Sequence, residues 1–416
     1  MNASHRPAFN CRACGSADYE EILDLGRVPL ANAFVMRAED DDDADHHPLC
    51  LILCSECRLL QIREEVNRDA LFTNYLWVTS TSAGAKDHAE WLSARLRERF
   101  LEPRTGPVRL VEIASNDGFF LQHYRDAGFD ILGVDPSNLA NEADARGLPS
   151  VRAFFGREVA ARIRAERGPA DLIVARNVLG HASELQDLVA GIGDLLAEDG
   201  TFVVEAPYAY RIREEVQYDY IFHEHLSYFT LTAMHNLLAR FGLTVVNIEF
   251  VEMNGGSVLC EIRRAPAPAA DTAMLAFERF IALESATGWL RFRDAVLRQR
   301  QEFVDLLRTL RAEHKRVVGY GAAAKFMTML NYCGIGRDLI AAVGDANPRK
   351  QGLLCPGVRI PVVSPQQLMD LKPDFIVIGA WNFKDEMIRQ LRERHDYKGA
   401  FIVPLPLPSI ERQDAT

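Results

Sequence analysis

The stretch that most constrains the fold of this chain covers residues 108–121. Residues 108–113 form a short apolar run typical of a buried strand, residues 114–118 are small or turn-forming, and a helical pattern begins at Phe119. Strand, tight loop and helix in this order open a Rossmann-like sheet, in which a nucleotide-shaped ligand lies across the carboxyl ends of the strands. The loop lacks the pattern G-x-G-x-x-G, so a dinucleotide is disfavoured. An ordinary α/β loop is the alternative.

The segments that follow alternate between strand and helix patterns. A second strand, residues 130–135, ends in Asp135, an acid suited to the two hydroxyls of a ribose. Later strands are predicted at residues 171–177, 201–207, 243–247 and 257–262, with helical patterns at 185–196 and 231–241. This alternation predicts a mostly parallel sheet, and the last two strands are expected to form an antiparallel hairpin because they are close in the sequence.

The composition changes at residues 265–270, a Pro- and Ala-rich boundary. Residues 272–314 beyond it are strongly helical, and their apolar stripe is expected to pack between domains. A second Rossmann-like unit is predicted from strands at 316–320, 339–343 and 375–379. The stripe consists of Phe277, Phe280, Ile281, Leu290, Val296, Phe303, Leu306 and Leu310.

Two C-x-x-C motifs stand near the N-terminus, Cys11 with Cys14 and Cys54 with Cys57. Each motif can present two thiolates from one turn, and four thiolates form the tetrahedral set of a structural zinc site with no open position for catalysis. Cys50, His46 and His47 are alternative ligands, and disulfides are the non-metal alternative, which a cytosolic setting disfavours. The acidic run at residues 39–43 is interpreted as a solvated loop.

Length and charge limit the possible classes of protein. A chain of 416 residues should hold two or three domains. A net charge of −11 argues against a nucleic-acid partner, which normally requires a basic face. The N-terminus lacks an apolar signal region, and no run of eighteen apolar residues occurs, so neither secretion nor membrane spanning is expected. We therefore expect a cytoplasmic location.

Taken together, the motifs resemble the sugar C-methyltransferases of antibiotic deoxysugar pathways, which methylate C-3 of nucleoside-diphosphate 4-keto-sugars. The resemblance covers essentially the whole chain. The motifs that carry it are the two C-x-x-C pairs with the intervening Leu23-Asp-Leu-Gly-x-x-Pro-Leu30, then Glu112-Ile-x-x-Asn-Asp-Gly118, His223-Glu-His225, Gly319-Tyr-Gly-Ala-x-Ala-Lys325, Asp345-x-Asn-Pro-x-Lys-Gln-Gly352 and Trp381-Asn382.

The resemblance implies an α/β architecture in three parts. These are a zinc-binding domain over residues 1–78, a class I methyltransferase domain over 79–265, and a helical segment with a second Rossmann-like domain over 266–416 that binds the nucleotide sugar. It implies S-adenosylmethionine and structural zinc as cofactors, and a nucleotide-linked sugar as the substrate. Neither nucleic acid nor membrane is expected as a partner.

The cofactor residues are expected along the strand–loop–helix unit and the strands beside it. Ala114 stands where many methyltransferases have glycine, and alanine is tolerable there only if its φ is not positive. Asp135 is expected to bind the ribose, and Phe154 with Phe155 to flank the adenine, with core packing as the alternative. The remaining candidates for the cofactor site are Glu112, Asn116, Gly118 and Asn177.

Carbon methylation beside a ketone requires a base for the α-proton and a donor for the resulting oxyanion. By its match to the family's histidine, His225 is the candidate base, and Glu224 would polarise a histidine or contact the sugar. His181 and Tyr75 are candidates for stabilising the enolate. On a strand, His223 and His225 would share one face, so a two-histidine metal site is the alternative.

Phe222 departs from the family, some of whose members carry tyrosine there. If that hydroxyl contacts the sugar elsewhere in the family, Tyr220, Tyr228 or Tyr75 must replace it here, or the substrate differs. Tyr220 and Phe222 are therefore candidate substrate residues.

The C-terminal unit is expected to hold the nucleotide. Lys325, at a Gly/Ala-rich loop, suits a pyrophosphate, and Asn347, Lys350 and Trp381 are further candidates, with a solvated lysine as the alternative for Lys350. Three other functions compete: O- or N-methylation of a related metabolite, a non-catalytic zinc protein, and an oxidoreductase that uses Gly319-Tyr-Gly321 for a dinucleotide.

Overall fold

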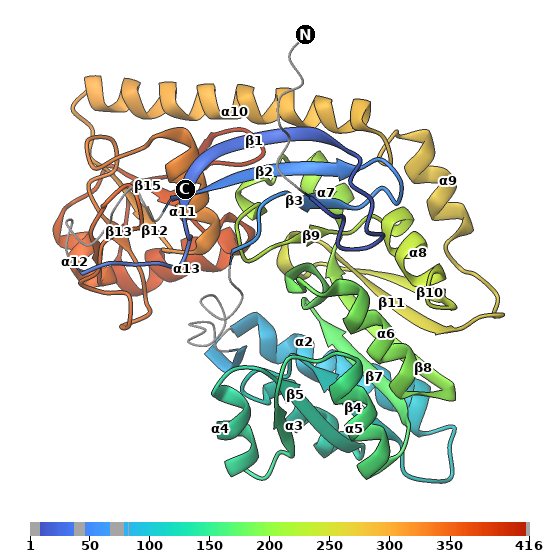
Figure 1. Cartoon of the computed structure of the whole chain (residues 1–416). Helices are drawn as coiled ribbons and strands as arrows, with labels where there is room; N and C mark the ends of the chain where they lie inside the picture. The colour runs from blue at the N-terminus through green and yellow to red at the C-terminus, as the bar shows by residue number, and fades with distance from the viewer. Residues whose placement is uncertain (1–8, 37–45, 67–78, 82, 413–416) are drawn as a thin grey trace.

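The computed structural model describes residues 9–36, 46–66, 79–81 and 83–412. The described strands form three sheets, of seven, four and six strands (Figure 1). The predicted acidic loop at residues 39–43 and Tyr75 lie outside the described residues.

The seven-stranded sheet has the order expected for alternating strands and helices. β4 (Arg109–Ile113) lies between β5 and β7, and the chain leaves β4 first toward β5 and β6 and later toward β7 and β8. This change of direction creates a crevice at the carboxyl ends of β4 and β7. The other strands are β5 (Asp130–Asp135), β6 (Ser150–Arg152), β7 (Ala170–Arg176), β8 (Leu196–Pro207), β10 (Leu243–Val251) and β11 (Ser257–Arg264).

Helices cover both faces of this sheet because alternate residues of each strand are apolar on opposite faces. Leu110, Leu172 and Val174 pack against one set of helices, whereas Val111 and Ile173 pack against the other. The first set comprises α2 (Ala83–Leu96), α3 (Phe119–Ala127) and α4 (Leu139–Ala145), and the second comprises α5 (Arg157–Arg167) and α6 (Leu185–Leu195). β10 and β11 form the predicted antiparallel hairpin.

The four-stranded sheet joins segments that are far apart in the sequence. A long hairpin of β1 (Tyr19–Pro29) and β2 (His46–Cys54) is followed by β3 (Leu60–Ile62). The fourth strand is β9 (Ser227–Tyr228), which pairs with β3 and comes from the segment after β8. The N-terminal sheet therefore includes residues that immediately follow His225.

The six-stranded sheet is parallel except for its last strand. Its order across the sheet is β14 (Val362–Val363), β13 (Val343–Gly344), β12 (Val317–Tyr320), β15 (Phe375–Ile378), β16 (Ala400–Val403) and β17 (Ser409–Glu411). The helices of this unit are α11 (Ala324–Cys333), α12 (Pro365–Asp370) and α13 (Lys384–His395).

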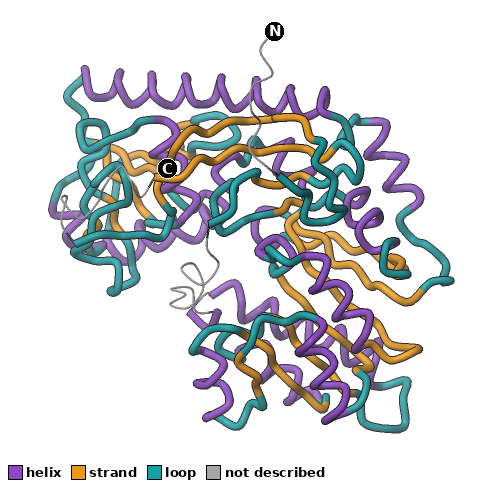
Figure 2. Tube along the Cα trace, viewed as in Figure 1, coloured by secondary structure: helices purple, strands orange, loops and turns teal. Residues whose placement is uncertain are grey.

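Two helices, α9 (Thr272–Phe280) and α10 (Ala286–Ala312), occupy the predicted helical segment. The long α10 runs along β1 and also contacts β12, α11 and α7 (Ala209–Glu214) (Figure 1 and Figure 2). Val296, Phe303 and Leu310 are buried in this packing, which confirms that part of the stripe. Phe280 is wrong as a packing residue, because it is 88% exposed, whereas Phe277 is 38% exposed and its ring lies 5.7 Å from that of Tyr210.

One predicted strand is mostly absent. Residues 339–342 form a turn and an extended segment, and the strand is limited to Val343–Gly344. The turn arises because the backbone N–H of Ile340 bonds back to the carbonyl of Gly336.

The remaining elements are α8 (Leu231–Ala239) and the short helical segments η3 (Thr79–Thr81), η4 (Arg97–Leu101), η5 (Leu179–His181), η6 (Tyr218–Tyr220), η7 (Met253–Gly255) and η8 (Trp381–Phe383). Within the described residues, none of the helices is both long and apolar enough to traverse a bilayer.

Candidate active site

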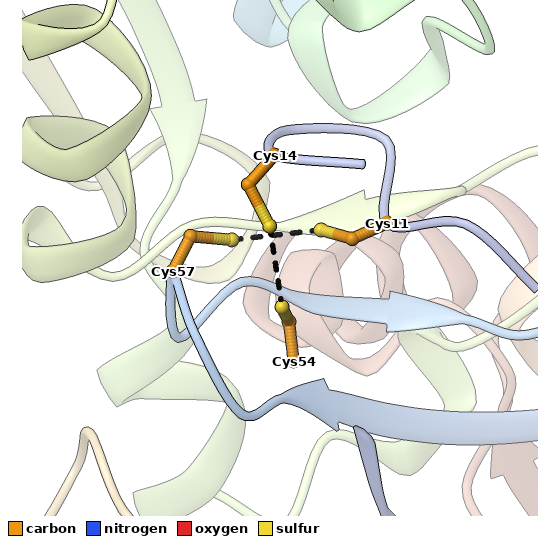
Figure 3. A group of neighbouring side chains, drawn as sticks. All are labelled: Cys11, Cys14, Cys54 and Cys57. Carbon is orange, nitrogen blue, oxygen red and sulfur yellow. Dashed lines mark hydrogen bonds between the residues drawn. The ribbon is translucent and has the colours of Figure 1, made fainter. Parts of the chain in front are cut away.

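The two C-x-x-C turns meet at one point of the N-terminal sheet. The four sulfur atoms point toward one another (Figure 3) and all lie within 4.8 Å of each other. The Cys11–Cys57 and Cys14–Cys54 sulfur separations are 3.5 and 3.6 Å, close to the ~3.8 Å edge of a tetrahedron with Zn–S bonds of about 2.3 Å. All four cysteines are free of disulfides. This donor set fits zinc.

The alternative ligands are not part of this cluster in the described residues. Cys50 packs in a separate apolar cluster with Tyr19 and Ile52. The ring of His47 lies against that of His223, with the centroids 5.7 Å apart. The zinc set is therefore the four cysteines of the two motifs.

The cysteine cluster is linked to the segment that carries His225. The Gln61 amide donates to Cys11 Sγ at 3.0 Å, and Arg12 donates to the Gln61 side chain and, at 2.7 Å, to the Ile62 carbonyl. Gln61 and Ile62 belong to β3, and the Ile62 N–H bonds to the carbonyl of Leu226, next to His225. The metal cluster thus holds β3, and β3 holds the strand after His225.

The loop after β4 uses left-handed backbone at alternate residues. Ala114, Asn116 and Gly118 have φ values of 58°, 52° and 73°. For Ala114 this contradicts the expectation that alanine is accepted because φ is not positive. The alanine is instead strained, by roughly 1–2 kcal/mol relative to a residue without Cβ.

Polar contacts fix this loop to its neighbours. Asp135, at the end of β5, accepts hydrogen bonds from the Asn116 N–H and from the N–H and hydroxyl of Ser137. The side-chain oxygen of Asn116 accepts from the backbone N–H and hydroxyl of Thr79, so η3 lies on the loop. A carboxylate has about four acceptor positions, and these three bonds leave Asp135 one position for a ribose hydroxyl.

Glu112 is buried beneath the loop and forms an ion pair. Its carboxylate accepts from Arg176 at 3.1 Å, and the guanidinium lies 3.1 Å from the centroid of the Phe120 ring. Burial raises the pKa of Glu112 to about 7, against the lowering effect of Arg176. On the same layer, Glu205 accepts from His88 Nε2 at 2.6 Å. Glu112 is thus engaged within the protein.

Three further cofactor candidates lie around the crevice. Phe154, after β6, is 37% exposed, whereas Phe155 packs against the apolar core. Asn177, after β7, has a φ of 53°, and its buried side-chain oxygen makes no hydrogen bond. Asn177 lines the same pocket as His225, at the border between the crevice and that pocket.

The His-Glu-His segment is a turn, closed by a hydrogen bond from the His225 N–H to the Phe222 carbonyl. The alternative of a two-histidine metal site required a strand here, and the turn rules it out. His223 Nε2 bonds to the Pro48 carbonyl. The Glu224 carboxylate accepts from Asn32 at 2.6 Å, with Lys350 as its neighbouring cation. These two residues face the N-terminal sheet, and no histidine metal cluster occurs among the described residues.

His225 points into a pocket at the carboxyl ends of β7 and β8. His225 Nδ1–H donates to the Tyr220 carbonyl at 2.8 Å, so the lone pair lies on Nε2. The ring centroids of Phe222, Tyr220 and His181 lie 3.8, 4.2 and 4.9 Å from that of His225. The pocket is lined by Asn177, Gly180, His181, Ala206, Pro207, Tyr220, His225, Ser227, Tyr228 and Phe229.

Both pocket histidines are neutral near pH 7. Burial lowers the pKa of His181 to about 4, although a hydrogen bond with the Glu224 backbone opposes this shift. Burial, and then repulsion from a charged His181, lowers the pKa of His225 well below its usual value. The Tyr228 hydroxyl lies buried in this pocket without a hydrogen-bond partner. Tyr228 and Tyr220 are thus the two expected replacement donors that the structure places here.

Two of the four candidates in the C-terminal unit, Lys325 and Trp381, lie next to Asp219 or Tyr220, the second of which lines the pocket. Trp381 Nε1–H donates to Asp219 at 2.8 Å. Lys325 Nζ lies over the rings of Tyr220 and Trp381, 4.7 and 5.3 Å from their centroids. Its ammonium nitrogen is buried, although the residue as a whole is partly exposed.

Lys350 and Asn347 are engaged within their own unit. Lys350 Nζ donates to the Ala322 carbonyl at 2.7 Å and is partly buried, so its interpretation as a solvated lysine is wrong. The Asn347 side chain accepts from the Arg349 N–H in a turn. Neither residue contacts the His225 pocket.

One known protein resembles the chain over its full length. C-methyltransferase NovU of Streptomyces niveus is 35% identical over 418 residues, which cover 99% of each chain. The chain belongs to this C-methyltransferase family. Three family models match successive parts of this C-methyltransferase. The model of a putative zinc binding domain matches residues 11–72, that of a methyltransferase domain matches 86–248, and that of a C-methyltransferase C-terminal domain matches 252–406.

Solved methyltransferase structures match smaller parts of the C-methyltransferase. Magnesium protoporphyrin IX methyltransferase of Synechocystis, solved with bound S-adenosylmethionine, is 13% identical, covering 44% of this chain and 80% of that one with a TM-score of 0.33. A methyltransferase from Archaeoglobus fulgidus is 21% identical, covering 39% and 72% with a TM-score of 0.32.

The C-methyltransferase uses S-adenosylmethionine as methyl donor and a structural zinc ion held by its four cysteines. The described residues fit both. The four thiolates form a closed set for zinc, Asp135 at the end of β5 has one spare acceptor position, and the side-chain oxygen of Asn177, after β7, is unbonded.

Several residues of this C-methyltransferase site escaped sequence reasoning. Asp219 is buried and bonded to Trp381, Asn32 bonds Glu224, and Arg176 pairs with Glu112. Each acts across two segments that are distant in the sequence, so no local motif marks it. The one available signal was that Arg176 directly precedes Asn177 at the end of a predicted apolar strand, where a buried charge requires a partner.

Proposed function

We propose that this C-methyltransferase transfers a methyl group from S-adenosylmethionine to C-3 of a nucleoside-diphosphate 4-keto-deoxysugar, through an enolate formed by His225. The observation that carries the proposal is the hydrogen bond from His225 Nδ1–H to the Tyr220 carbonyl. This bond fixes the tautomer whose Nε2 accepts a proton, in a pocket at the carboxyl ends of the strands.

The neighbours of His225 supply the rest of the chemistry. The low pKa of His225 keeps its imidazole neutral and ready to accept a proton near pH 7. The hydroxyl of Tyr228 is an O–H donor for the ketone oxygen, as an oxyanion requires, and neutral His181 lines the same pocket. Phe222 packs on the His225 ring and orients it. The role of Phe222 in this chain is therefore to position the base.

The three parts of the chain divide the remaining work. S-adenosylmethionine supplies an electrophilic methyl group on a sulfonium. Asp135 binds its ribose, and Phe154 flanks its adenine. Residues 1–78 hold zinc and support the His225 segment, residues 79–265 bind the methyl donor, and residues 266–416 bind the nucleotide of the sugar.

Solvent exchange tests the proposal. The protein is incubated in heavy water with thymidine-diphosphate 4-keto-2,6-dideoxyglucose, with and without S-adenosylmethionine, and the sugar is analysed by mass spectrometry. The native enzyme is expected to take up deuterium at C-3 and to add one methyl group on carbon. His225→Ala is expected to lose both activities by ~10²–10⁴-fold. His235→Asn is the matched control. His235 belongs to α8, pairs with Asp271 and lies outside the pocket.

Two results would contradict the proposal. Full exchange in His225→Ala would exclude His225 as the base. A native enzyme that gives neither exchange nor a C-methyl product, but methylates a hydroxyl or amine of a related sugar, would establish O- or N-methylation instead.

A further inference from the structure

We propose that Lys325 is a further catalytic residue, whose ammonium group contacts the substrate oxygen on which negative charge develops when His225 removes the α-proton. The inference rests on the proposed function and deepens it. It changes the role expected for Lys325 from a pyrophosphate contact to an oxyanion contact.

The first observation is that Lys325 is buried without a partner. Its Nζ makes no hydrogen bond and no ion pair in the described part of the chain. The Nζ atom lies at cation–π distance from the ring faces of Tyr220 and Trp381. Ring faces leave the three N–H donors of the ammonium without acceptors. Since a desolvated charge without a partner is costly, such a group is usually retained for a ligand.

The second observation is the position of Lys325 at the His225 pocket. Tyr220 forms part of the pocket lining, and the centroid of its ring lies 4.7 Å from Lys325 Nζ and 4.2 Å from the centroid of the His225 ring. The charge of Lys325 is close enough to lower the pKa of His225, although less than burial and His181 do. Lys325 is therefore close to the base, even though it belongs to α11 of the C-terminal unit.

The third observation concerns Asp219, the carboxylate nearest to Lys325. One Asp219 oxygen accepts from Trp381 Nε1, and the other is buried without a partner. The two groups attract each other electrostatically. They do not form a salt bridge in the described part of the chain. Asp219 therefore favours the charged form of Lys325 without occupying its donors, and we assign it as a positioning residue.

The pocket has a need that this ammonium meets. Both histidines are neutral, so Lys325 is the cation that the described structure places beside them. A fixed cation in a site of low dielectric stabilises a developing oxyanion more strongly than a neutral donor does.

The step balances without any further reactant. His225 Nε2 binds the proton on the carbon next to the ketone, the C–H electron pair becomes the C=C bond, and the carbonyl π pair moves to the oxygen facing Lys325. The enolate carbon then bonds to the methyl carbon as the S–CH₃ bond breaks and its electron pair stays on sulfur. The ketone re-forms, and the proton on His225 passes to solvent.

The test compares exchange with binding in the full-length zinc protein. Lys325→Met, Lys325→Gln and Lys325→Arg are measured at saturating thymidine-diphosphate 4-keto-2,6-dideoxyglucose, together with KM and the Kd of thymidine diphosphate. Removal of the charge is expected to slow exchange and methyl transfer at saturation by ~10²–10³-fold, with the Kd of thymidine diphosphate unchanged within about threefold. Lys325→Arg is expected to recover part of the rate. Lys384→Met, which breaks a partly exposed ion pair with Glu411 in the same unit, is the matched control.

Each other outcome overturns a defined claim. A raised KM and Kd with an unchanged rate at saturation would make Lys325 a diphosphate contact and refute this inference alone. Should Lys325→Met fail to fold, the polar Lys325→Gln gives the same comparison. A native enzyme without exchange or C-methyl transfer refutes the proposed function, and this inference falls with it.

Discussion

Two buried charged clusters in this C-methyltransferase differ in how their charges are paired. The first, which we call the sheet cluster, comprises Glu112, Arg176, Glu205 and His88 under the cofactor loop. Each member has a partner within 3.1 Å. The second, the pocket cluster, comprises Asp219, Lys325, His181 and His225. Its cation, Lys325, has no hydrogen-bonded partner among the described residues.

The difference separates structural charges from functional ones. A buried ion pair is expensive to break, because the remaining partner stays desolvated and alone. An unpaired buried charge already carries that cost in the folded protein, so its removal relieves the fold and removes only what it does for a ligand. The sheet cluster should therefore respond to mutation in stability, and the pocket cluster in activity.

The largest expected effect is a loss of stability when a mutation breaks the sheet cluster. Arg176→Met leaves Glu112 buried without its cation and is expected to lower the free energy of unfolding by about 3–5 kcal/mol, measured by urea denaturation. Arg311→Met removes an exposed ion pair with Asp338 and should cost less than about 1 kcal/mol. An equal, small loss in both variants would show that the sheet cluster is not structural.

The same measurement on Lys325→Met sharpens the contrast. Because no hydrogen bond to Nζ is lost, the free energy of unfolding should stay within about 1 kcal/mol of the native value or rise. The rate of methyl transfer should nevertheless fall by ~10²–10³-fold. A loss of stability comparable to that of Arg176→Met would place Lys325 among the structural charges.

The pocket histidines should separate pH effects on stability from those on activity. The pKa of His181 is lowered to about 4 in the folded state, so the unfolded chain binds more protons between pH 6.5 and 4. Stability is then complete above pH 6.5 and falls as the pH drops, by on the order of 2 kcal/mol after allowance for partial exposure. His181→Asn should show a shallower fall in thermal unfolding scans.

The activity of the native enzyme should not follow this curve between pH 8 and 6.5, because His225 stays neutral there. The pH dependence of kcat/KM is the measurement. An acidic limb with an apparent pKa at or above 6.5 would mean that the catalytic base is not this buried imidazole.

The smallest effect concerns the strained loop beside the sheet cluster. Ala114→Gly relieves a left-handed alanine and should raise the free energy of unfolding by ~0.5–1 kcal/mol, the relief being partly offset by greater freedom of the unfolded chain. Ala145→Gly, at an exposed helical position in α4, should instead lose about 1 kcal/mol. A loss in both variants would mean that the loop does not strain Ala114.

Local patterns predicted much of this molecule. The strand ending at Asp135, the strand–loop–helix unit at β4 and the hairpin of β10 and β11 all follow from periodicity and turn residues over short stretches. The four cysteines were also readable, because each C-x-x-C turn holds its pair locally and the metal chemistry joins the two pairs.

What sequence reasoning missed depends on contacts between distant segments. The pairing of β9 with β3, just after the turn that holds His223 and His225, joins segments more than 160 residues apart, and no local pattern marks it. Lys325 is placed by the packing of the C-terminal sheet against Tyr220, which no spacing in the sequence encodes. The left-handed Ala114 was misjudged because the conformation of its loop depends on Asp135 at the end of the neighbouring strand.

The pairing of β3 with β9 also imposes an order on synthesis. The ribosome makes both cysteine turns and β1 to β3 early, yet Ser227 and Tyr228 emerge only after most of the central sheet has been translated. Until then the outer edge of β3 lacks its neighbour, and an open strand edge is a site for wrong pairing. The nascent N-terminal region must therefore wait, with its zinc in place, for the segment that carries His225. The catalytic base is thus fixed in place only after a large part of the chain has been made.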